Sequence, residues 1–271
     1  MGPGFLPSRR AALAALLASA ALLLGGCAIA PLAPDAVREA LAPTGKLRVG
    51  MYQGSPTSLV VDRATGERRG ITWDLGRELA ARLGVPFEPV EFPRVAEVFE
   101  ALKAGRVDVT FTNASAARQR EADFTPALVD LELGYLVVPG SPVNAIADVD
   151  QPGRRIGVSQ GSTSQATLSG VYKHAAIRTA PNLRAAGEML AKREIDAFAT
   201  NKAILFELSD TVPGSRVLEG RWGLEHLGFA IPKGRDAGMG WLRVFALDMR
   251  NGGLVDESVK RAGLRGSVRP E

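Results

Sequence analysis

The chain has 271 residues, of which 46% are hydrophobic and 23% are charged, as in a globular protein with a sizeable core. Its formal net charge is +4, and Arg9 and Arg10 near the N-terminus supply two of these charges, so the rest of the chain carries +2. No basic run or basic–aromatic interleaving is present, which argues against nucleic-acid binding. The single cysteine excludes an intrachain disulfide, and with only two histidines beside it we predict no metal site and no cofactor.

Residues 1–26 have the pattern of an export signal, because Arg9-Arg10 precede an apolar run at 11–24. That run is shorter than the roughly 20 apolar residues that span a bilayer. The signal ends in Leu-Gly-Gly-Cys27, a sequence that resembles the lipobox of bacterial lipoproteins, in which the cysteine is acylated and becomes the mature N-terminus. Cleavage after Ala30 is the alternative. The leader leaves open whether export is general or twin-arginine dependent.

From this pattern we expect a protein anchored by lipid at Cys27 in the periplasm or cell envelope, with the membrane as one of its partners. Residues 27–44 are rich in alanine and proline and are predicted to form a tether.

After the tether, the first half alternates strands and helices. A strand is predicted at 46–52, a hairpin at 59–70, a helix capped by Thr72 and ended by Gly84, a strand at 86–92, a helix from Val95 to Gly105 and a strand at 107–111.

Residues 105–126 contain the first candidate binding rim. The strand at 107–111 runs into a polar cluster at 112–115, where Ser115 is predicted to cap a short helix that carries Arg118. Ligands of open α/β sheets lie beyond the carboxyl ends of strands, and an arginine there presents a planar fork of donors to a carboxylate. The alternative is a surface arginine paired with Glu121 or Asp123.

The second half repeats this plan after a Pro-Gly-Ser-Pro crossing at 139–142. The segment "Ala-Gly-Arg-Val-Asp-Val" followed by Asn113 is echoed by "Lys-Arg-Glu-Ile-Asp-Ala" followed by Asn201. Two similar lobes with facing rims would enclose a cleft. The other elements expected are strands at 132–138, 155–159, 177–180, 195–199 and 227–231, and helices capped by Asn182 and Asn201. The tail is expected to form an amphipathic helix with Trp241, Val244, Phe245 and Met249 on its apolar face, and then a shorter helix after Gly253.

Together these features resemble the extracytoplasmic solute-binding proteins of family 3, which serve amino-acid ABC transporters. The resemblance covers residues 45–234 and rests on three motifs. Gly-Ile-Thr-Trp-Asp-Leu at 70–75 is similar to the family's Gly-Phe-Asp-x-Asp-Leu, Arg118 with Asp-Phe-Thr-Pro at 123–126 is similar to its Arg-x4-Asp-Phe-Ser-x-Pro, and Gly-Ser-Thr at 161–163 is similar to its Gly-Thr-Thr.

The resemblance implies an α/β fold of the type II periplasmic-binding-protein class, in which two Rossmann-like lobes are joined by two hinge strands. Lobe 1 would take residues 45–138 and 227–271, and lobe 2 residues 139–226. By motif, Arg118 and Thr163 would hold the ligand's carboxylate, with Ser162 adjacent and Asn113 at a position where the family usually has Ser or Thr.

Two departures from the family concern the ligand. Asn201 stands where an aspartate normally pairs with the ligand's α-ammonium; either the substrate lacks that group, or Asn201 is only a helix cap and another carboxylate serves the amine. The aromatic positions that sandwich ligands are also changed: the one near Gly54 has no ring and the other is Val95. Tyr52 is a candidate substitute, and the alternative is that Tyr52 only packs within its strand.

These features favour a non-enzymatic, monomeric binding component of an ABC transporter that clamps a small carboxylate-bearing solute and docks on a permease. One alternative is a cyclohexadienyl-dehydratase-like enzyme, disfavoured because no carboxylate adjoins Ser162-Thr163 in the sequence and Asn201 cannot titrate. The other is a lipid-tethered sensor, which would usually carry signalling domains.

His174, His226 and Asp74 are expected to be structural, while Arg94 and Lys202 are weak candidates for contact with a second acidic group.

Overall fold

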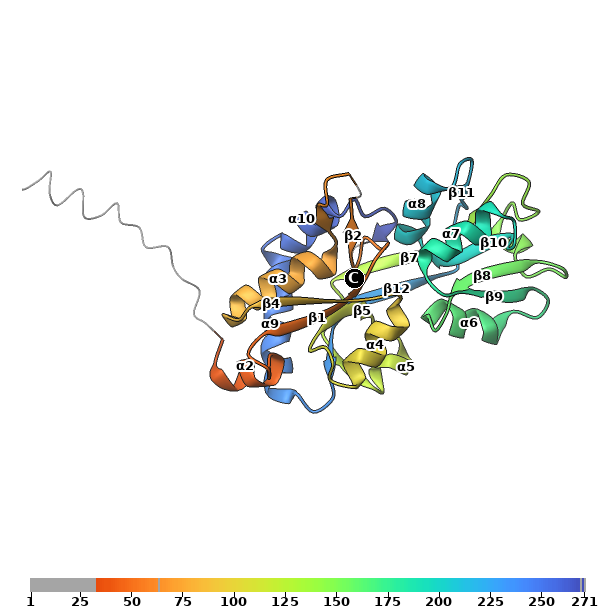
Figure 1. The fold of residues 1–271 in the computed structure, drawn as a ribbon. Helices are drawn as coiled ribbons and strands as arrows, with labels where there is room; N and C mark the ends of the chain where they lie inside the picture. Colours follow the sequence, from red (N-terminus) through yellow and green to blue (C-terminus); the bar gives the residue numbers. More distant parts are fainter. Residues whose placement is uncertain (1–32, 63, 269, 271) are drawn as a thin grey trace, which may run out of the picture. The chain divides into compact units, whose positions relative to one another are not determined.

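The computed structural model describes residues 33–62, 64–268 and 270, which form one compact unit with two α/β lobes (Figure 1). The expected export signal and the lipidation site at Cys27 lie outside these residues. The elements of lobe 1 up to the first crossing are α2 (Asp35–Leu41), β1 (Leu47–Tyr52), β2 (Val60–Val61), β3 (Arg68–Arg69), α3 (Ile71–Leu83), β4 (Phe87–Phe92), α4 (Val95–Lys103), β5 (Thr110–Asn113), α5 (Ala116–Gln119) and β6 (Ala122–Phe124).

The second lobe begins after β7 (Val129–Val137), and β12 (Gly223–Pro232) returns the chain to lobe 1. Lobe 2 contains η1 (Ile146–Asp148), β8 (Arg155–Ser159), α6 (Thr163–Val171), β9 (Ala176–Ala180), α7 (Leu183–Ala191), β10 (Ala197–Asn201), α8 (Lys202–Thr211) and β11 (Arg216–Val217). The chain ends with α9 (Asp236–Asn251), α10 (Leu254–Arg261) and β13 (Ser267–Val268).

The two lobes are linked by β7 and β12, which are antiparallel to each other along Val129–Leu133 and Gly223–Leu227. Beyond this shared segment the strands diverge. The second half of β7 pairs with β10 in lobe 2, whereas the second half of β12 pairs with β5 and β6 in lobe 1. Because each strand ends in a different lobe, bending of this pair changes the separation of the lobes.

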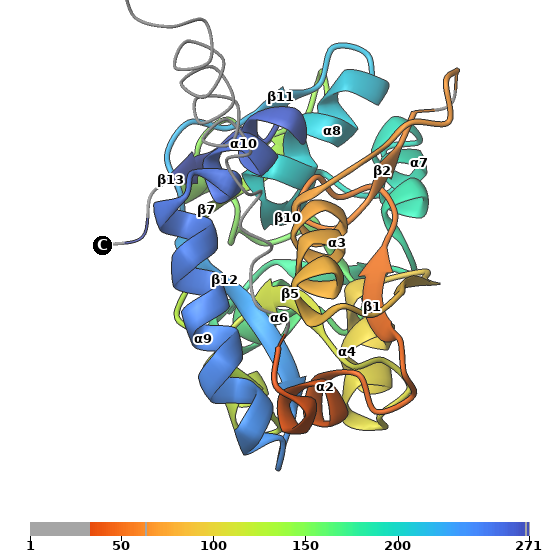
Figure 2. The same cartoon turned by 90° about the vertical axis from the view of Figure 1, so that its left-hand side faces the viewer.

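Each lobe has its own core. In lobe 1 the helices α3, α9 and α10 bury leucine, methionine and phenylalanine side chains against the strands, and Figure 2 shows α9 running along β12. In lobe 2, separate clusters lie on the two faces of the β8–β10 sheet, one around Tyr135 and Ile156 and the other around Phe198 and Leu205.

The sequence repeat corresponds to a repeated ion pair. In lobe 1, Asp108 accepts hydrogen bonds from the backbone N–H and the guanidinium of Arg48, with the shortest at 2.7 Å. In lobe 2, Asp196 accepts the same set from Arg155, again with the shortest at 2.7 Å. Each aspartate thereby ties the strand that leads to the cleft to the first strand of its lobe.

Three local expectations were wrong. Residues 35–41 lie within the predicted tether but form α2, which buries Val37 and Leu41 and contacts α9.

The second wrong expectation concerns the cap of α3, which is Gly70 rather than Thr72. The buried hydroxyl of Thr72 instead donates to the Thr57 carbonyl at 2.7 Å. Gly70 has φ +149°, and a Cβ there would lie 2.3 Å from the Ser58 carbonyl oxygen, so this turn requires glycine.

The third wrong expectation concerns the last amphipathic helix. Val244 was assigned to its apolar face but is 58% exposed, because the buried arc of α9 is formed by Leu242, Phe245 and Met249 and turns away from it.

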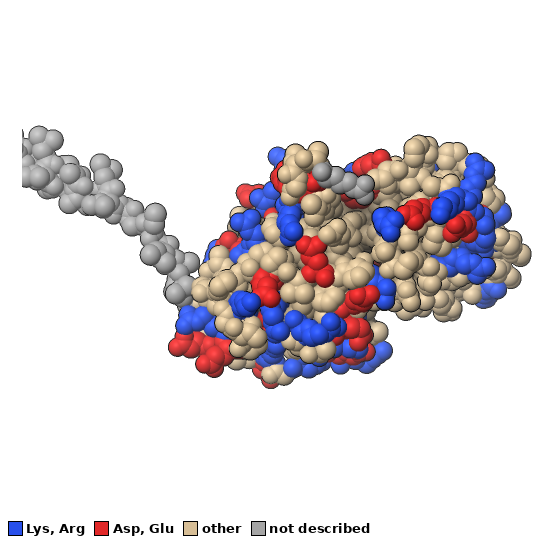
Figure 3. All heavy atoms as spheres, viewed as in Figure 1, with Lys and Arg blue, Asp and Glu red and all other residues tan. Residues whose placement is uncertain are grey.

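Charges are mixed over the surface. Figure 3 shows basic and acidic side chains interspersed on the viewed face of the described residues. No helix among residues 33–62 and 64–268 is both long enough and apolar enough to cross a membrane.

Candidate functional site

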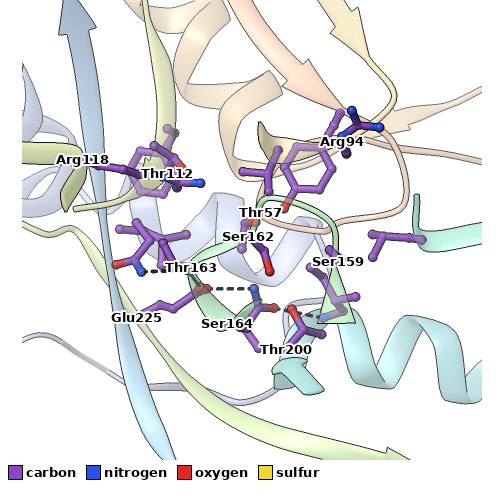
Figure 4. Close-up of a pocket in the computed structure, with 18 of the residues that line it drawn as sticks. Thr57, Arg94, Thr112, Arg118, Ser159, Ser162, Thr163, Ser164, Thr200 and Glu225 are labelled. Carbon is purple, nitrogen blue, oxygen red and sulfur yellow. Dashed lines mark hydrogen bonds between the residues drawn. The ribbon is translucent and has the colours of Figure 1, made fainter. Parts of the chain in front are cut away.

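A pocket between the lobes contains the six residues that the sequence predicted as the main ligand contacts, whereas Lys202, a weak candidate, does not line it. From lobe 1 it is lined by the polar ends of β1 and β5, from lobe 2 by the N-termini of α6 and α8, and from the linking strands by the start of β12 (Figure 4). The predicted residues found together in its lining are Tyr52, Asn113, Arg118, Ser162, Thr163 and Asn201.

Arg118 is held at the lobe 1 side of the pocket by the short helix α5. Ser115 caps this helix, as expected, with its hydroxyl accepting from the Arg118 backbone N–H at 3.4 Å. The guanidinium donates to the Thr112 hydroxyl at 2.7 Å and lies 5.0 Å from the centre of the Phe99 ring. These contacts fix the position of the cation before any ligand arrives.

The alternative surface role of Arg118 is wrong, because its expected partners pair elsewhere. Glu121 binds Lys103 and Asp123 binds Lys233, both at 2.6 Å or less. Arg118 is only 7% exposed, and within the described part of the chain no carboxylate lies at ion-pair distance from it. Burial lowers the pKa of its guanidinium, and the negative charge of Glu225 partly offsets this. Arginine stays charged in proteins, so the pocket holds a buried cation without a counter-ion in contact.

On the lobe 2 side, helix N-termini present the polar groups. Ser162 caps α6 by accepting from the Gln165 N–H at 3.1 Å, and Thr163 is the first residue of that helix. The Thr163 hydroxyl also accepts from the Asn113 side chain at 3.4 Å, a contact between the two lobes. A helix N-terminus with free N–H groups favours an anionic ligand group.

Asn201 both caps a helix and faces the pocket. Its Oδ1 accepts from the Ile204 N–H at 3.1 Å, which makes it the N-cap of α8. Its Nδ2 donates to Glu225 at 3.0 Å. The sequence treated these two roles as alternatives, and the geometry combines them.

Glu225 is the main correction to the sequence-based account of the site. The expectation was that no carboxylate adjoins Ser162-Thr163, but one oxygen of Glu225 accepts from the Thr163 hydroxyl at 3.0 Å. The other oxygen accepts from Asn201, and the residue is only 8% exposed. Both partners are neutral. The pocket therefore contains a buried anion as well as a buried cation, and Figure 4 shows both side chains beside the cavity.

Sequence reasoning missed Glu225 because the strand was predicted to begin at Leu227. The observed strand β12 begins at Gly223, four residues earlier. Its alternation was the available signal, since Glu225, Leu227, Phe229 and Ile231 follow at a spacing of two and are all buried. A glutamate in phase with three buried apolar residues points into the protein.

Tyr52 lies at the end of β1, where its backbone N–H donates to the Ser58 hydroxyl at 2.9 Å. Burial raises the pKa of its phenol, so the hydroxyl keeps its proton at neutral pH. Val95 also lines the pocket, at the start of α4.

The residues judged weak or structural are held by other partners. Arg94 lines the pocket but is paired with Glu97 at 2.9 Å, and Lys202 binds Glu132 at 2.6 Å. Asp74 is paired with Arg261, and His226 contacts Asp130 across the two linking strands at 2.8 Å. Among the described residues, no cluster of His, Cys, Asp and Glu has the arrangement of a metal site.

Comparison with solved structures shows the class of this fold, which is the type II periplasmic-binding-protein fold. The crystal structure of an ancestral amino acid-binding protein, a precursor of cyclohexadienyl dehydratase, superposes with a TM-score of 0.72 at 24% identity, covering 83% of this chain and 98% of that one. The profile of the bacterial extracellular solute-binding proteins, family 3, matches residues 47–262. The chain therefore belongs to that family.

Two curated relatives differ in how much of each chain is matched. The ABC transporter glutamine-binding protein GlnH of Bacillus subtilis is 23% identical over 202 residues, which is 73% of this chain and 74% of that protein. The membrane-bound lytic murein transglycosylase F of Vibrio cholerae is 36% identical over 105 residues, 38% of this chain but 19% of that enzyme. Its activity is therefore not transferred to this chain.

Proposed function

We propose that this protein is the substrate-binding component of an ABC transporter and clamps a small carboxylate-bearing solute, an amino acid or a similar molecule, between its lobes. The observation that supports this most is the buried Arg118, which has no carboxylate in contact among the described residues and lies at the rim of a pocket lined by both lobes. A ligand carboxylate would supply the missing counter-ion. Thr163 and Ser162 would hold the same carboxylate from lobe 2, with Asn113, Asn201 and Tyr52 completing the contacts.

Transport follows from the way such a ligand would stabilise closure. A solute that contacts Arg118 in lobe 1 and Thr163 in lobe 2 binds the closed arrangement more tightly than the open one. The closed form would be the one that a permease recognises. On this proposal the protein acts as a monomer and performs no chemistry.

The test is a thermal-shift screen of residues 28–271 against amino acids, amides, keto acids and hydroxy acids. The segment should include α2, since this helix contacts α9. A ligand at 100 times its dissociation constant stabilises by about 2.7 kcal/mol. For a chain of this size that corresponds to a shift of about 5–10 °C. Absence of any shift across the panel would count against the proposal.

A cyclohexadienyl-dehydratase-like activity is the second candidate, because Glu225 provides the carboxylate next to Thr163 that such chemistry would need. A general acid must carry a proton and give it to the substrate, and the Glu225 oxygens lie within hydrogen-bond distance of the Thr163 hydroxyl and the Asn201 amide. Incubation with prephenate and arogenate distinguishes the two: turnover would contradict the transport proposal, and we expect none. A lipid-tethered sensor would bind the same ligands but would not require a permease.

We also propose that the protein is anchored to the cell envelope through lipid on Cys27. In cells that express the full chain, we expect the protein in the membrane fraction and the Cys27→Ser variant in the soluble or unprocessed fraction. Labelling with a radioactive fatty acid should mark the wild type alone. A wild type that is released from membranes by salt without detergent would overturn the lipid anchor.

A further inference from the structure

The pocket has two buried charges of opposite sign, and among the residues that the structure describes neither has an oppositely charged partner in contact. Arg118 is 7% exposed and Glu225 is 8% exposed. Arg118 contacts a hydroxyl and an aromatic ring, and Glu225 contacts a hydroxyl and an amide. Burial of a charge is costly unless an opposite charge or hydrogen bonds compensate for it. The combination suits a ligand that carries both charges.

The pocket lining has a third charged side chain, but it adds no net charge to the site. Arg94 is the remaining charged residue there, and Glu97 neutralises it at 2.9 Å. What is left is one cation, one anion and neutral groups. The neutral polar groups are hydroxyls and amides, among them Thr57, Ser159 and Asn182, and the remaining lining residues are apolar.

We infer that Glu225 is the residue that binds the ligand's α-ammonium, so that the site accepts zwitterionic α-amino acids although Asn201 is not an aspartate. This inference rests on the proposed function and deepens it. Glu225 and Asn201 share a hydrogen bond of 3.0 Å, so the carboxylate lies beside the position at which this sequence has a neutral amide where the family normally has an aspartate. The negative charge of this site is therefore carried by Glu225 on the linking strand β12, next to Asn201 at the end of β10.

The placement has a consequence for specificity. Asn201 keeps the helix cap through its Oδ1 and steadies Glu225 through its Nδ2, so it acts as a positioning residue. Because Glu225 sits on β12, which is shared by both lobes, the ammonium would be bound by the hinge itself. The carboxylate would be bound by the two rims. Removal of the ammonium from the ligand would leave Glu225 buried without its counter-ion.

The first experiment needs no variant. Protein purified from cells that express the full chain is titrated by calorimetry with the standard L-amino acids, and the one that binds most tightly is compared with its 2-hydroxy and 2-oxo analogues. We expect the analogues to bind at least tenfold more weakly, which is about 1.4 kcal/mol. Analogues that bind as tightly as the amino acid would overturn the inference and leave the proposed function intact. No binding of either set would contradict the proposed function, and the inference with it.

The second experiment uses a charge swap. Glu225→Gln should weaken binding of the amino acid at least tenfold and abolish its advantage over the 2-hydroxy analogue. The double variant Asn201→Asp/Glu225→Gln should restore that advantage, because aspartate also caps a helix and returns the negative charge to the neighbouring position. A merely structural role of Glu225 would not be rescued in this way.

The matched control is Glu132→Gln. This variant removes the same charge from the adjacent strand β7. Glu132 pairs there with Lys202 and Arg221, outside the pocket. We expect it to leave the ratio of amino acid to hydroxy-acid affinity unchanged. If Glu225→Gln leaves that ratio unchanged too, the inference is wrong.

Discussion

Replacing Arg118 by methionine is expected to weaken ligand binding by about 10- to 150-fold, the equivalent of a charge-assisted hydrogen bond of about 1.5–3 kcal/mol. The reason is that Arg118 has no other anion in contact among the described residues and already has its orientation fixed by Thr112 and the Phe99 ring. A ligand carboxylate is thus the group that this cation lacks. Calorimetry with the tightest ligand from the screen measures the effect.

The matched control is Arg120→Met, which removes the same charge two residues away. Arg120 follows α5 and is exposed, so its loss should change the affinity by less than twofold. An Arg118→Met variant that folds, as judged by its ligand-free melting temperature, and still binds within twofold of the wild type would contradict the role proposed for Arg118.

The largest effect on stability is expected at Asp108. Its side chain is fully buried and holds two arginines, Arg48 at 2.7 Å and Arg235 at 3.2 Å. Replacing it by alanine leaves two partly buried cations without their counter-ion, and breaking such a pair costs about 3–5 kcal/mol. The expected fall in melting temperature is about 6–20 °C at two to four degrees per kcal/mol.

The repeat supplies a comparison for Asp108 within the same molecule. Asp196 makes the same bonds to Arg155, but its side chain is 12% exposed and that of Arg155 is 39% exposed. Asp196→Ala should therefore cost less than Asp108→Ala in urea unfolding. If the two variants are equally destabilised, burial does not set the strength of this contact.

Asp196 should also show a dependence on pH. Burial raises the pKa of this carboxyl, but the hydrogen bonds from Arg155 outweigh burial and the net pKa is lowered. A group with a lowered folded-state pKa adds stability above its unfolded pKa of about 4 and loses it as the pH falls further. The stability difference between wild type and Asp196→Ala should therefore shrink in acid.

The sequence alone predicted the helix caps around the pocket, where local chemistry decides the structure. Ser115, Asn182 and Asn201 were identified as helix caps from their side chains and positions, and each accepts the expected backbone N–H. Asn201 and the Arg118 helix were placed at a common cleft because a similar strand–rim unit occurs once in each half of the chain. These inferences depend on residues that are close together in the sequence.

What the sequence did not settle depends on contacts between distant segments. Arg118 could have been paired with Glu121 or Asp123, and only the folded chain shows that those carboxylates bind lysines elsewhere. The length of β12 was underestimated because its first half is a strand only through pairing with β7, about ninety residues earlier in the chain.

The sequence by itself determined the two repeated α/β halves, because hydrophobic periodicity, caps and turn residues act locally. Only the tertiary structure showed which charged groups line the cleft. Asn201 was read from the sequence as a missing negative charge, whereas folding brings Glu225 to within 3.0 Å of it from another strand. The net charge of a buried site depends on which side chains come together there, and here the pairing of distant strands determines which ones do.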